Sequence, residues 1–120
     1  MRKPTRTPYR YSDCKVDRII DGDTCDLWIN LGFSTFVKKR IRMWGINAPE
    51  SRTRNKAEKV LGLAAKARLI ELLSGGVCDL DSLELGKYGR VLGLLYVGDI
   101  NVNAEMLKTE GTTEYYGGKR

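Results

Sequence analysis

Short apolar alternations divide the first half of the chain into strands separated by turn residues. Lys15–Ile20 is rich in Val and Ile, which is typical of a strand, and it ends at Asp21-Gly22-Asp23, where glycine permits a tight turn. In Thr24–Asn30 every second side chain is apolar, which predicts a strand with one buried face. After a turn at Leu31-Gly32, residues 33–44 are expected to form a third strand. The short connections make these three strands antiparallel neighbours.

The apolar period then lengthens to that of a helix, from Asn55 to about Leu73. Asn55 is a candidate N-cap, and Gly75-Gly76 is a stop signal. Two further strands are predicted at Val77–Leu83 and Val91–Val97, followed by a short helix from Val102 to about Thr109. The apolar stripe of the long helix is expected to contain Ala57, Val60, Leu61, Ala64, Ala65, Leu69 and Leu72.

The order of these elements predicts a mainly β fold with helices, a five-stranded β-barrel of the OB type. The main helix would lie between the third and fourth strands, and the short helix near the C-terminus. Residues 14–120 are expected to form this single domain. Residues 1–13 carry four basic side chains and no acid before Asp13, and they are predicted to form a flexible basic arm.

The amino-acid composition limits the binding partners, catalytic groups and metal ligands that this chain can have. The formal net charge of +6 in 120 residues favours a polyanionic partner, with nucleic acid first and an anionic membrane second. The chain has no His, which excludes a Ser-His-Asp triad and a His-bound zinc. Three irregularly spaced Cys residues are expected to be buried apolar positions. The basic N-terminus is followed by no apolar segment, so a cytoplasmic protein without a membrane span is expected.

Three clusters of polar residues lie in predicted turns or at strand ends. They are Asp21–Thr24, then Arg42 with Asn47–Glu50, and Lys87–Arg90. Each has a simple interpretation alone, respectively a tight turn, a surface ion pair between Arg42 and Glu50, and a hairpin connection. Together they offer carboxylates for a hard cation, a carboxylate base and two guanidinium groups, which is what phosphodiester hydrolysis requires. Oxygen ligands favour Ca²⁺, Mg²⁺ or Mn²⁺ over zinc.

The same clusters carry a resemblance to a known family. The segments Ile20-Asp-Gly-Asp-Thr24, Arg42-Met-Trp-Gly-Ile-Asn-Ala-Pro-Glu50 and Lys87-Tyr-Gly-Arg90 resemble the staphylococcal nuclease (thermonuclease) family over roughly residues 15–116. Val102-Asn103 and Tyr115-Tyr116 resemble its closing segment. The resemblance implies an OB barrel and a Ca²⁺-dependent nuclease that cleaves DNA, with RNA as a further candidate, with little sequence preference, and leaves 3′-phosphate ends.

The resemblance also implies a role for each matching position. Asp23, Asn47 and the backbone carbonyl of Ala48 would bind Ca²⁺, with Mg²⁺ or Mn²⁺ as alternatives. Asp21 would support the metal and its waters without binding the metal directly. Glu50 would be the general base, while Arg42 and Arg90 would hold the phosphate. The nucleic acid would contact Lys87, Tyr88 and Tyr116, with Lys38 and Arg40 on the polar face of the third strand as further candidates.

Two departures from the family pattern leave an alternative open. Asn47 stands where the family has Asp, so one anionic ligand is missing and weaker metal binding is expected. The second candidate function is therefore an OB-fold module that binds nucleic acid without cleaving it, and the third is a protein adaptor. The chain also lacks the further C-terminal helix of the family, so a monomer or weak homodimer is expected. A compact chain of this kind would suit a phage or plasmid gene.

Overall fold

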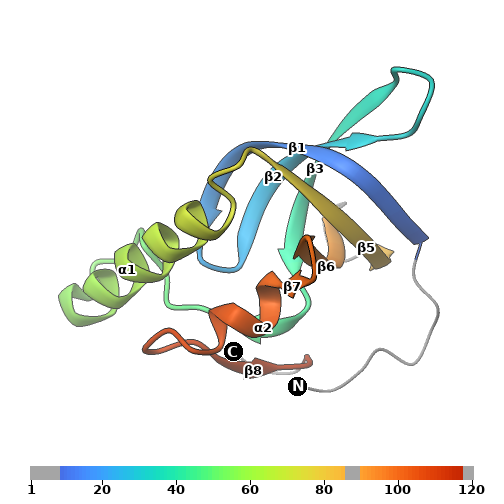
Figure 1. The fold of residues 1–120 in the computed structure, drawn as a ribbon. Helices are drawn as coiled ribbons and strands as arrows, with labels where there is room; N and C mark the ends of the chain where they lie inside the picture. Colours follow the sequence, from blue (N-terminus) through green and yellow to red (C-terminus); the bar gives the residue numbers. More distant parts are fainter. Residues whose placement is uncertain (1–8, 86–89, 118–120) are drawn as a thin grey trace.

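A five-stranded barrel with a helix across one end forms the core of the molecule (Figure 1). The computed structural model describes residues 9–85 and 90–117. The elements are β1 (Tyr9–Asp21), β2 (Thr24–Asn30), β3 (Phe36–Met43), β4 (Gly45–Asn47), α1 (Lys56–Leu72), β5 (Val77–Leu85), β6 (Val91–Val97), β7 (Ile100–Asn101), α2 (Val102–Met106) and β8 (Thr113–Tyr115). None of the helices in this described part is long and apolar enough to cross a membrane.

The barrel closes through one parallel pairing. Antiparallel pairs join β3 to β2, β2 to β1, β1 to β5 and β5 to β6. The open sheet is then closed by β3 and β6, whose residues Ile41 and Arg42 pair with Val91 and Leu92. The predicted OB-type barrel, with its main helix between the third and fourth barrel strands, is thus confirmed.

Alternating side chains of the strands fill the barrel. In β2, Cys25, Leu27 and Ile29 are buried, as the sequence pattern predicts. Cys14 and Cys78 are also buried and face each other across β1 and β5, so all three thiols belong to the core. Burial raises the pKa of Cys78 to about 12, which keeps this thiol protonated and unreactive.

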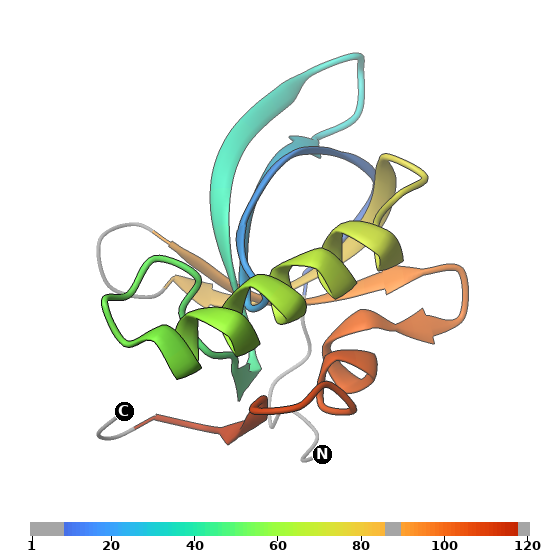
Figure 2. The same cartoon turned by 90° about the vertical axis from the view of Figure 1, so that its left-hand side faces the viewer.

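Helix α1 lies across the end of the barrel at which β1 turns into β2 (Figure 2). Its N-cap is Asn55, whose side chain accepts a hydrogen bond from the backbone N of Glu58, as predicted. Gly62, Ala65 and Leu69 face the barrel and are buried. The predicted stripe was too wide, since Val60 is 67% exposed: at 3.6 residues per turn it points about 180° away from Leu69, on the opposite side of the helix from the barrel.

The structure also corrects several boundaries. Strand β1 begins at Tyr9, within the predicted arm, because residues 9–11 pair with β5 and Arg10 forms an ion pair with Asp81. Strand β3 begins at Phe36, since residues 31–35 form the turn before it. The short strands β4 and β8, which pair with each other, were not predicted, because three-residue strands have no measurable period.

Asn103 is a buried polar residue that joins three separate segments. Its side-chain oxygen accepts from the backbone N of Leu95 at 3.0 Å. Its amide nitrogen donates to the carbonyls of Trp44 at 2.8 Å and Gly93 at 3.0 Å. Asn103 therefore ties α2 to β6 and to the residue that links β3 to β4.

Replacing Asn103 by Leu should strongly destabilise the fold. The change removes the partner of the Leu95 N–H and of the Trp44 carbonyl, and each buried unpaired group costs about 1–3 kcal/mol, whereas the Gly93 carbonyl still accepts from the backbone N of Trp44. We expect the free energy of unfolding in urea, followed by tryptophan fluorescence, to fall by about 3 kcal/mol or more. Asn101→Ala is the control: it removes the α2 N-cap contact to Ala104 and should cost about 1 kcal/mol. Equal losses in the two variants would contradict this role of Asn103.

Candidate active site

The tight turn between β1 and β2 supplies a buried carboxylate. Asp23 is 3% exposed. Its Oδ1 accepts from the hydroxyl of Thr24 at 2.8 Å, and its Oδ2 accepts from the backbone N of Ala48 at 2.8 Å. A buried carboxylate requires such donors, and the second of them comes from 25 residues further along the chain.

Glycine is required in this turn by close packing. A Cβ at Gly22 would lie 2.7 Å from the Cβ of Ala65 and 3.1 Å from that of Ala48. The turn therefore rests directly on α1 and on the segment after β4. The sequence interpretation of Asp-Gly-Asp as a tight turn is correct, but the turn is buried rather than exposed.

Arg42 lies near the end of β3, where its register partner is Thr24. The residue is 7% exposed, so a surface ion pair is excluded as its role. Its Nη1 donates to the carbonyls of Ile46 at 2.9 Å and Met43 at 3.1 Å, which fixes the plane of the guanidinium group. Nη1 also lies 3.4 Å from Oδ2 of Asp23.

Asn47 is brought to the same group from the end of β4. Its side-chain oxygen lies 3.5 Å from Nη2 of Arg42, at the limit of a hydrogen bond. The backbone of Ala48, the next residue, holds Asp23. The four residues Asp23, Arg42, Asn47 and Ala48 thus form one contact network.

The loop that carries Glu50 is held from two sides while its side chain stays exposed. On one side, Ser51 donates from its backbone N, at 3.1 Å, and from its hydroxyl to Oδ1 of Asp21. On the other side Gly62 of α1 packs against the peptide, since a Cβ there would lie 2.1 Å from the carbonyl oxygen of Glu50. No hydrogen bond or ion pair engages the Glu50 carboxylate within residues 9–85 and 90–117.

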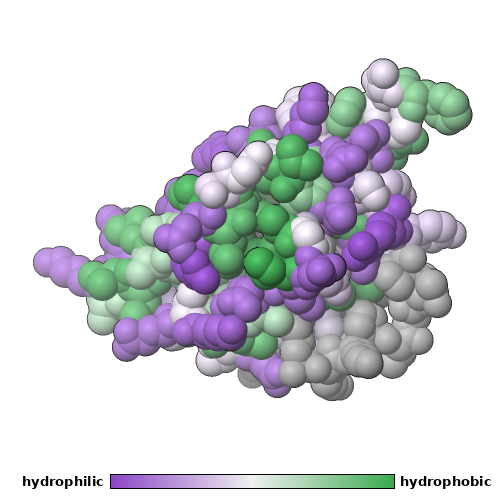
Figure 3. All heavy atoms as spheres, viewed as in Figure 1, coloured by the Kyte–Doolittle hydropathy of each residue, from purple (hydrophilic) through white to green (hydrophobic). Residues whose placement is uncertain are grey.

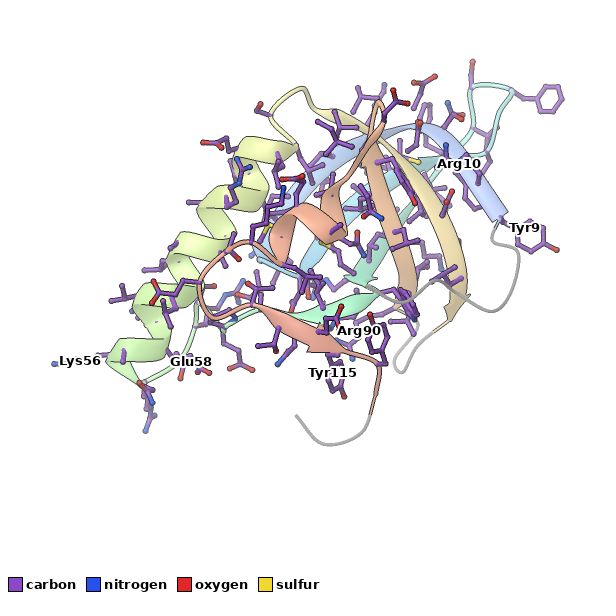
Figure 4. The ribbon with its side chains drawn as sticks, turned by 60° about the horizontal axis from the view of Figure 1, so that its bottom comes forward. Tyr9, Arg10, Lys56, Glu58, Arg90 and Tyr115 are labelled. Carbon is purple, nitrogen blue, oxygen red and sulfur yellow. The ribbon has the colours of Figure 1, made fainter. Side chains whose placement is uncertain are left out.

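An open groove of about 560 Å³ lies beside this loop. Its polar lining includes Asn47, Glu50, Asn55 and Glu58. Figure 4 shows Glu58 at the start of α1, beside the loop that leads into the helix. Asn55 and Glu58 are groove residues that the sequence interpretation missed as part of the site, because Asn55 is explained as the helix N-cap and Glu58 as a polar residue outside the apolar stripe of the helix.

The aromatic residues near the C-terminus form a second wall. Strand β8 pairs with β4, and this pairing places the ring of Tyr115 5.9 Å from the guanidinium carbon of Arg42. Tyr116 meets the ring of Trp44 edge-on, with centroids 5.0 Å apart. Together with Arg42 they line a hollow of about 190 Å³. Tyr115 was not among the predicted contact residues, because nothing local marks the β4–β8 pairing.

The structure does not gather all predicted residues into the network. Arg90 directly precedes β6 and lies at the same rim of the barrel as Tyr115 (Figure 4). Lys38 and Arg40 lie further along β3, where they form ion pairs with Asp17 at 3.0 Å and Asp26 at 2.8 Å. Lys87 and Tyr88 lie outside the described residues.

The oxygen atoms at and near Asp23 are the type of ligand that a hard cation prefers. Asp21, Asp23, Asn47 and the carbonyl of Ala48 offer oxygen atoms alone, which suits Ca²⁺ or Mg²⁺. No cluster of three or more Asp, Glu, Cys or His side chains suited to a metal occurs in the part of the chain that the structure describes. A cation here would therefore be held by two side-chain carboxylates at most, together with neutral oxygens.

Comparison with known proteins identifies the family. A model of the family described as "Staphylococcal nuclease homologue" matches residues 40–117, which is more than half of the chain. The chain belongs to this family. The matched region contains Arg42, Asn47, Glu50 and Arg90, whereas the Asp21–Asp23 turn precedes it.

Two curated relatives agree with the family assignment. The chain is 34% identical over 115 residues to "Micrococcal nuclease" of Shigella flexneri, covering 86% of this chain and 59% of the relative. It is 32% identical over 100 residues to "SPbeta prophage-derived endonuclease YokF" of Bacillus subtilis (strain 168), covering 80% of this chain and 32% of the relative. The chain thus spans less than two thirds of the length of either relative.

Replacing Gly62 by Ala should test the packing behind Glu50. In a helix this change normally stabilises by about 1 kcal/mol, but here the added methyl group meets the Glu50 carbonyl. We expect a loss of about 1–3 kcal/mol in the free energy of unfolding, typical of overpacking. Gly75→Ala, where a Cβ meets nothing within 4 Å, should be nearly neutral. A Gly62→Ala variant as stable as the natural protein would show that the loop is not held by this contact.

Proposed function

We propose that this chain is a metal-dependent nuclease, with Ca²⁺ as its cation, that hydrolyses phosphodiester bonds of DNA and RNA with little sequence preference. The proposal is carried by one observation: Asp23, Arg42, Asn47 and Ala48 meet in a single network, and the exposed carboxylate of Glu50 lies at its edge. The groups that we propose as cation ligands, as the phosphate-binding guanidinium and as the base are thereby close together.

Asp23, Asn47 and the carbonyl of Ala48 would hold the cation, with Mg²⁺ or Mn²⁺ as alternatives. Asp21 would support the metal and its waters while anchoring Ser51 through its Oδ1. When bound, the cation supplies positive charge close to the phosphate oxygens, where negative charge increases during the reaction. Every proposed ligand atom in this set is an oxygen, and this supports a hard cation such as Ca²⁺.

Glu50 would accept a proton from the water molecule that attacks phosphorus. The backbone at Glu50 is held between Asp21 and Gly62, so the point from which its exposed carboxylate extends is fixed. Arg42 and Arg90 would bind the phosphate oxygens, and Arg90 would also favour departure of the 5′-oxygen. The bond from phosphorus to the 5′-oxygen breaks, and the phosphate remains on the 3′ side.

Nucleic acid would be bound chiefly through its backbone. Lys87, Tyr88 and Tyr116 are the proposed contacts, and for Tyr116 the hollow that it lines with Tyr115 and Arg42 supports this role. The sequence contains nothing that resembles a base-reading helix, which supports cleavage with little sequence preference.

Asn47 favours a second candidate function. An amide oxygen binds a hard cation without contributing a negative charge, and losing one charged ligand costs about 1–3 kcal/mol of binding. A module with this change would bind nucleic acid without turnover. Such a protein would bind DNA in a salt-dependent manner because phosphate contacts release counterions.

Replacing Glu50 by Gln should abolish cleavage while leaving DNA binding nearly unchanged. The amide keeps the size of the carboxylate but has no basic oxygen that can take the proton. Cleavage of plasmid and single-stranded DNA is measured on gels with Ca²⁺, Mg²⁺ or Mn²⁺ added to metal-stripped protein, and binding by mobility shift. Glu71→Gln, on the exposed face of α1, is the control and should cleave normally. Equal cleavage by both variants would exclude Glu50 as the base, and absence of cleavage by the natural protein with every metal would favour the binding module.

Replacing Asn47 by Asp should tighten metal binding. The new carboxylate restores the charge at the proposed ligand position, so we expect Ca²⁺ affinity to rise by about tenfold to a hundredfold in calorimetric titration. Cleavage should then reach half its maximum at lower Ca²⁺. Asn55→Asp adds the same charge to the same groove and preserves helix capping, so it separates ligation from a general charge effect. The ligand role of position 47 is wrong if the titration is unchanged, or if both variants shift it equally.

A further inference from the structure

The β2–β3 hairpin extends beyond the barrel and ends in exposed apolar side chains. Figure 1 shows it as the projection furthest from α2 and β8. We call residues 31–35 the hairpin tip. Phe33 is entirely exposed and Leu31 is 48% exposed, and Figure 3 shows apolar surface at this end of the molecule.

The tip has a defined and strained backbone. The backbone N of Leu31 donates to the carbonyl of Thr35 at 2.8 Å, and the Asn30 side chain accepts from the backbone N of Gly32 at 2.8 Å. Phe33 has φ +54° and Ser34 has φ +59°, in the left-handed region that bulky side chains rarely adopt. Neither residue gains buried contacts that would offset this cost, because both are exposed. Strain of this kind points to a function for the exposed ring.

Cationic side chains line the strands between the tip and the candidate active site. In β3, Arg40 and Lys38 are two and four residues from Arg42, respectively, and share its face. Lys15 and Arg18 lie opposite β2 on the neighbouring strand β1, and Lys39 is exposed on the other face of β3. Asp17 and Asp26 pair with two of these five cations, so positive charge remains in excess along the hairpin.

The length of the strip suits a polynucleotide that already occupies the active site. Six residues of β3 separate Phe36 from Arg42, which corresponds to about 20 Å along the strand. The same distance corresponds to about six steps of a nucleic acid duplex. A backbone that follows the cations of β3 from the site would therefore reach the hairpin tip.

We propose that the β2–β3 hairpin is an accessory binding arm for nucleic acid, in which Phe33 stacks on a base and the cations of β3 follow the phosphates. The inference rests on the proposed function, because it assumes that a nucleic acid bound at the candidate active site leaves that site along β3. An aromatic ring stacks on any base, so the arm adds affinity without sequence preference. An anionic membrane is the less favoured partner because the tip offers two large apolar side chains and its cations run in a strip along β3 towards the site instead of surrounding the tip.

Binding measurements test the arm independently of cleavage. Fluorescence anisotropy in chelator gives the dissociation constant for a single-stranded DNA of about 20 nucleotides and for a dinucleotide, which is too short to join the site to the tip even when it is fully extended. Phe33→Ala should weaken binding of the long DNA about tenfold and leave the short DNA unaffected. Phe33→Trp should restore binding, whereas Phe33→Leu, apolar but unable to stack, should not. Lys38→Gln, on the face of β3 that leads to Arg42, should lower the slope of log affinity against log salt by about one.

Matched controls come from α1, on another side of the barrel. Leu63→Ala and Lys59→Gln remove an exposed apolar and an exposed basic residue there, and should leave binding of the long DNA unchanged. Urea unfolding checks that each variant is folded; Phe33 is exposed, so its replacement should not reduce stability. Cleavage plays no part in these measurements. If the protein binds DNA through Phe33 but does not cleave it, the proposed arm is supported and the proposed nuclease function is wrong.

Two results would overturn the arm. One is equal affinity of the natural protein and Phe33→Ala for the long DNA at low salt. The other is sedimentation of the natural protein, but not of Phe33→Ala, with phosphatidylserine vesicles while DNA affinity stays the same, which would assign the tip to a membrane.

Discussion

The hydrogen bond from the backbone N of Ala48 to the carboxylate of Asp23 is the contact on which the candidate active site depends. It joins the β1–β2 turn to the segment after β4, which are 25 residues apart, and it satisfies a carboxylate that is almost wholly buried. A hydrogen bond to a charged group contributes about 1.5–3 kcal/mol, and leaving that group unpaired costs more. Throughout the described residues every buried side-chain nitrogen or oxygen has a partner, so this polar interior is fully satisfied. This bond therefore fixes the part of the segment next to Asn47, while Asp21 and Gly62 hold the part that carries Glu50.

Close packing of small residues supplies the second half of this constraint. Gly22 in the turn and Gly62 in α1 each lie where a methyl group would collide, with Ala65 in one case and with the Glu50 peptide in the other. The helix consequently acts as a rigid support directly behind both loops. The helix touches the barrel through one narrow face, so the apolar residues on its other faces, Val60, Leu63 and Ile70, remain exposed.

Much of the barrel could be predicted from sequence because its strands have clean local signals. Alternation of apolar residues predicts the bounds of β2 and β6. The Asn55 side chain predicts the N-cap of α1. The β4–β8 pairing could not be predicted, because two three-residue strands contain no period and meet only after the barrel has formed. That pairing is what brings Tyr115 to Arg42, so the aromatic side of the site was predicted only in part. The burial of Arg42 was likewise missed, since alternation along β3 groups it with the exposed Lys38 and Arg40.

Arg42 shows why Asn47 affects more than metal charge. Its guanidinium is fixed by two backbone carbonyls and lies 3.4 Å from the carboxylate of Asp23, while the Asn47 oxygen is 3.5 Å from Nη2. In the proposed reaction the same guanidinium binds a phosphate, so every carboxylate close to it competes with the substrate. An Asp at position 47 would place a second carboxylate against Arg42, and the charge-assisted bond between them would be roughly twice as strong as the neutral one. In the proposed site Asn47 would weaken the hold on a cation, but it would also leave Arg42 less tightly bound by the protein. The two effects would act on the proposed nuclease in opposite directions, because metal affinity would decrease while the availability of Arg42 for phosphate would increase.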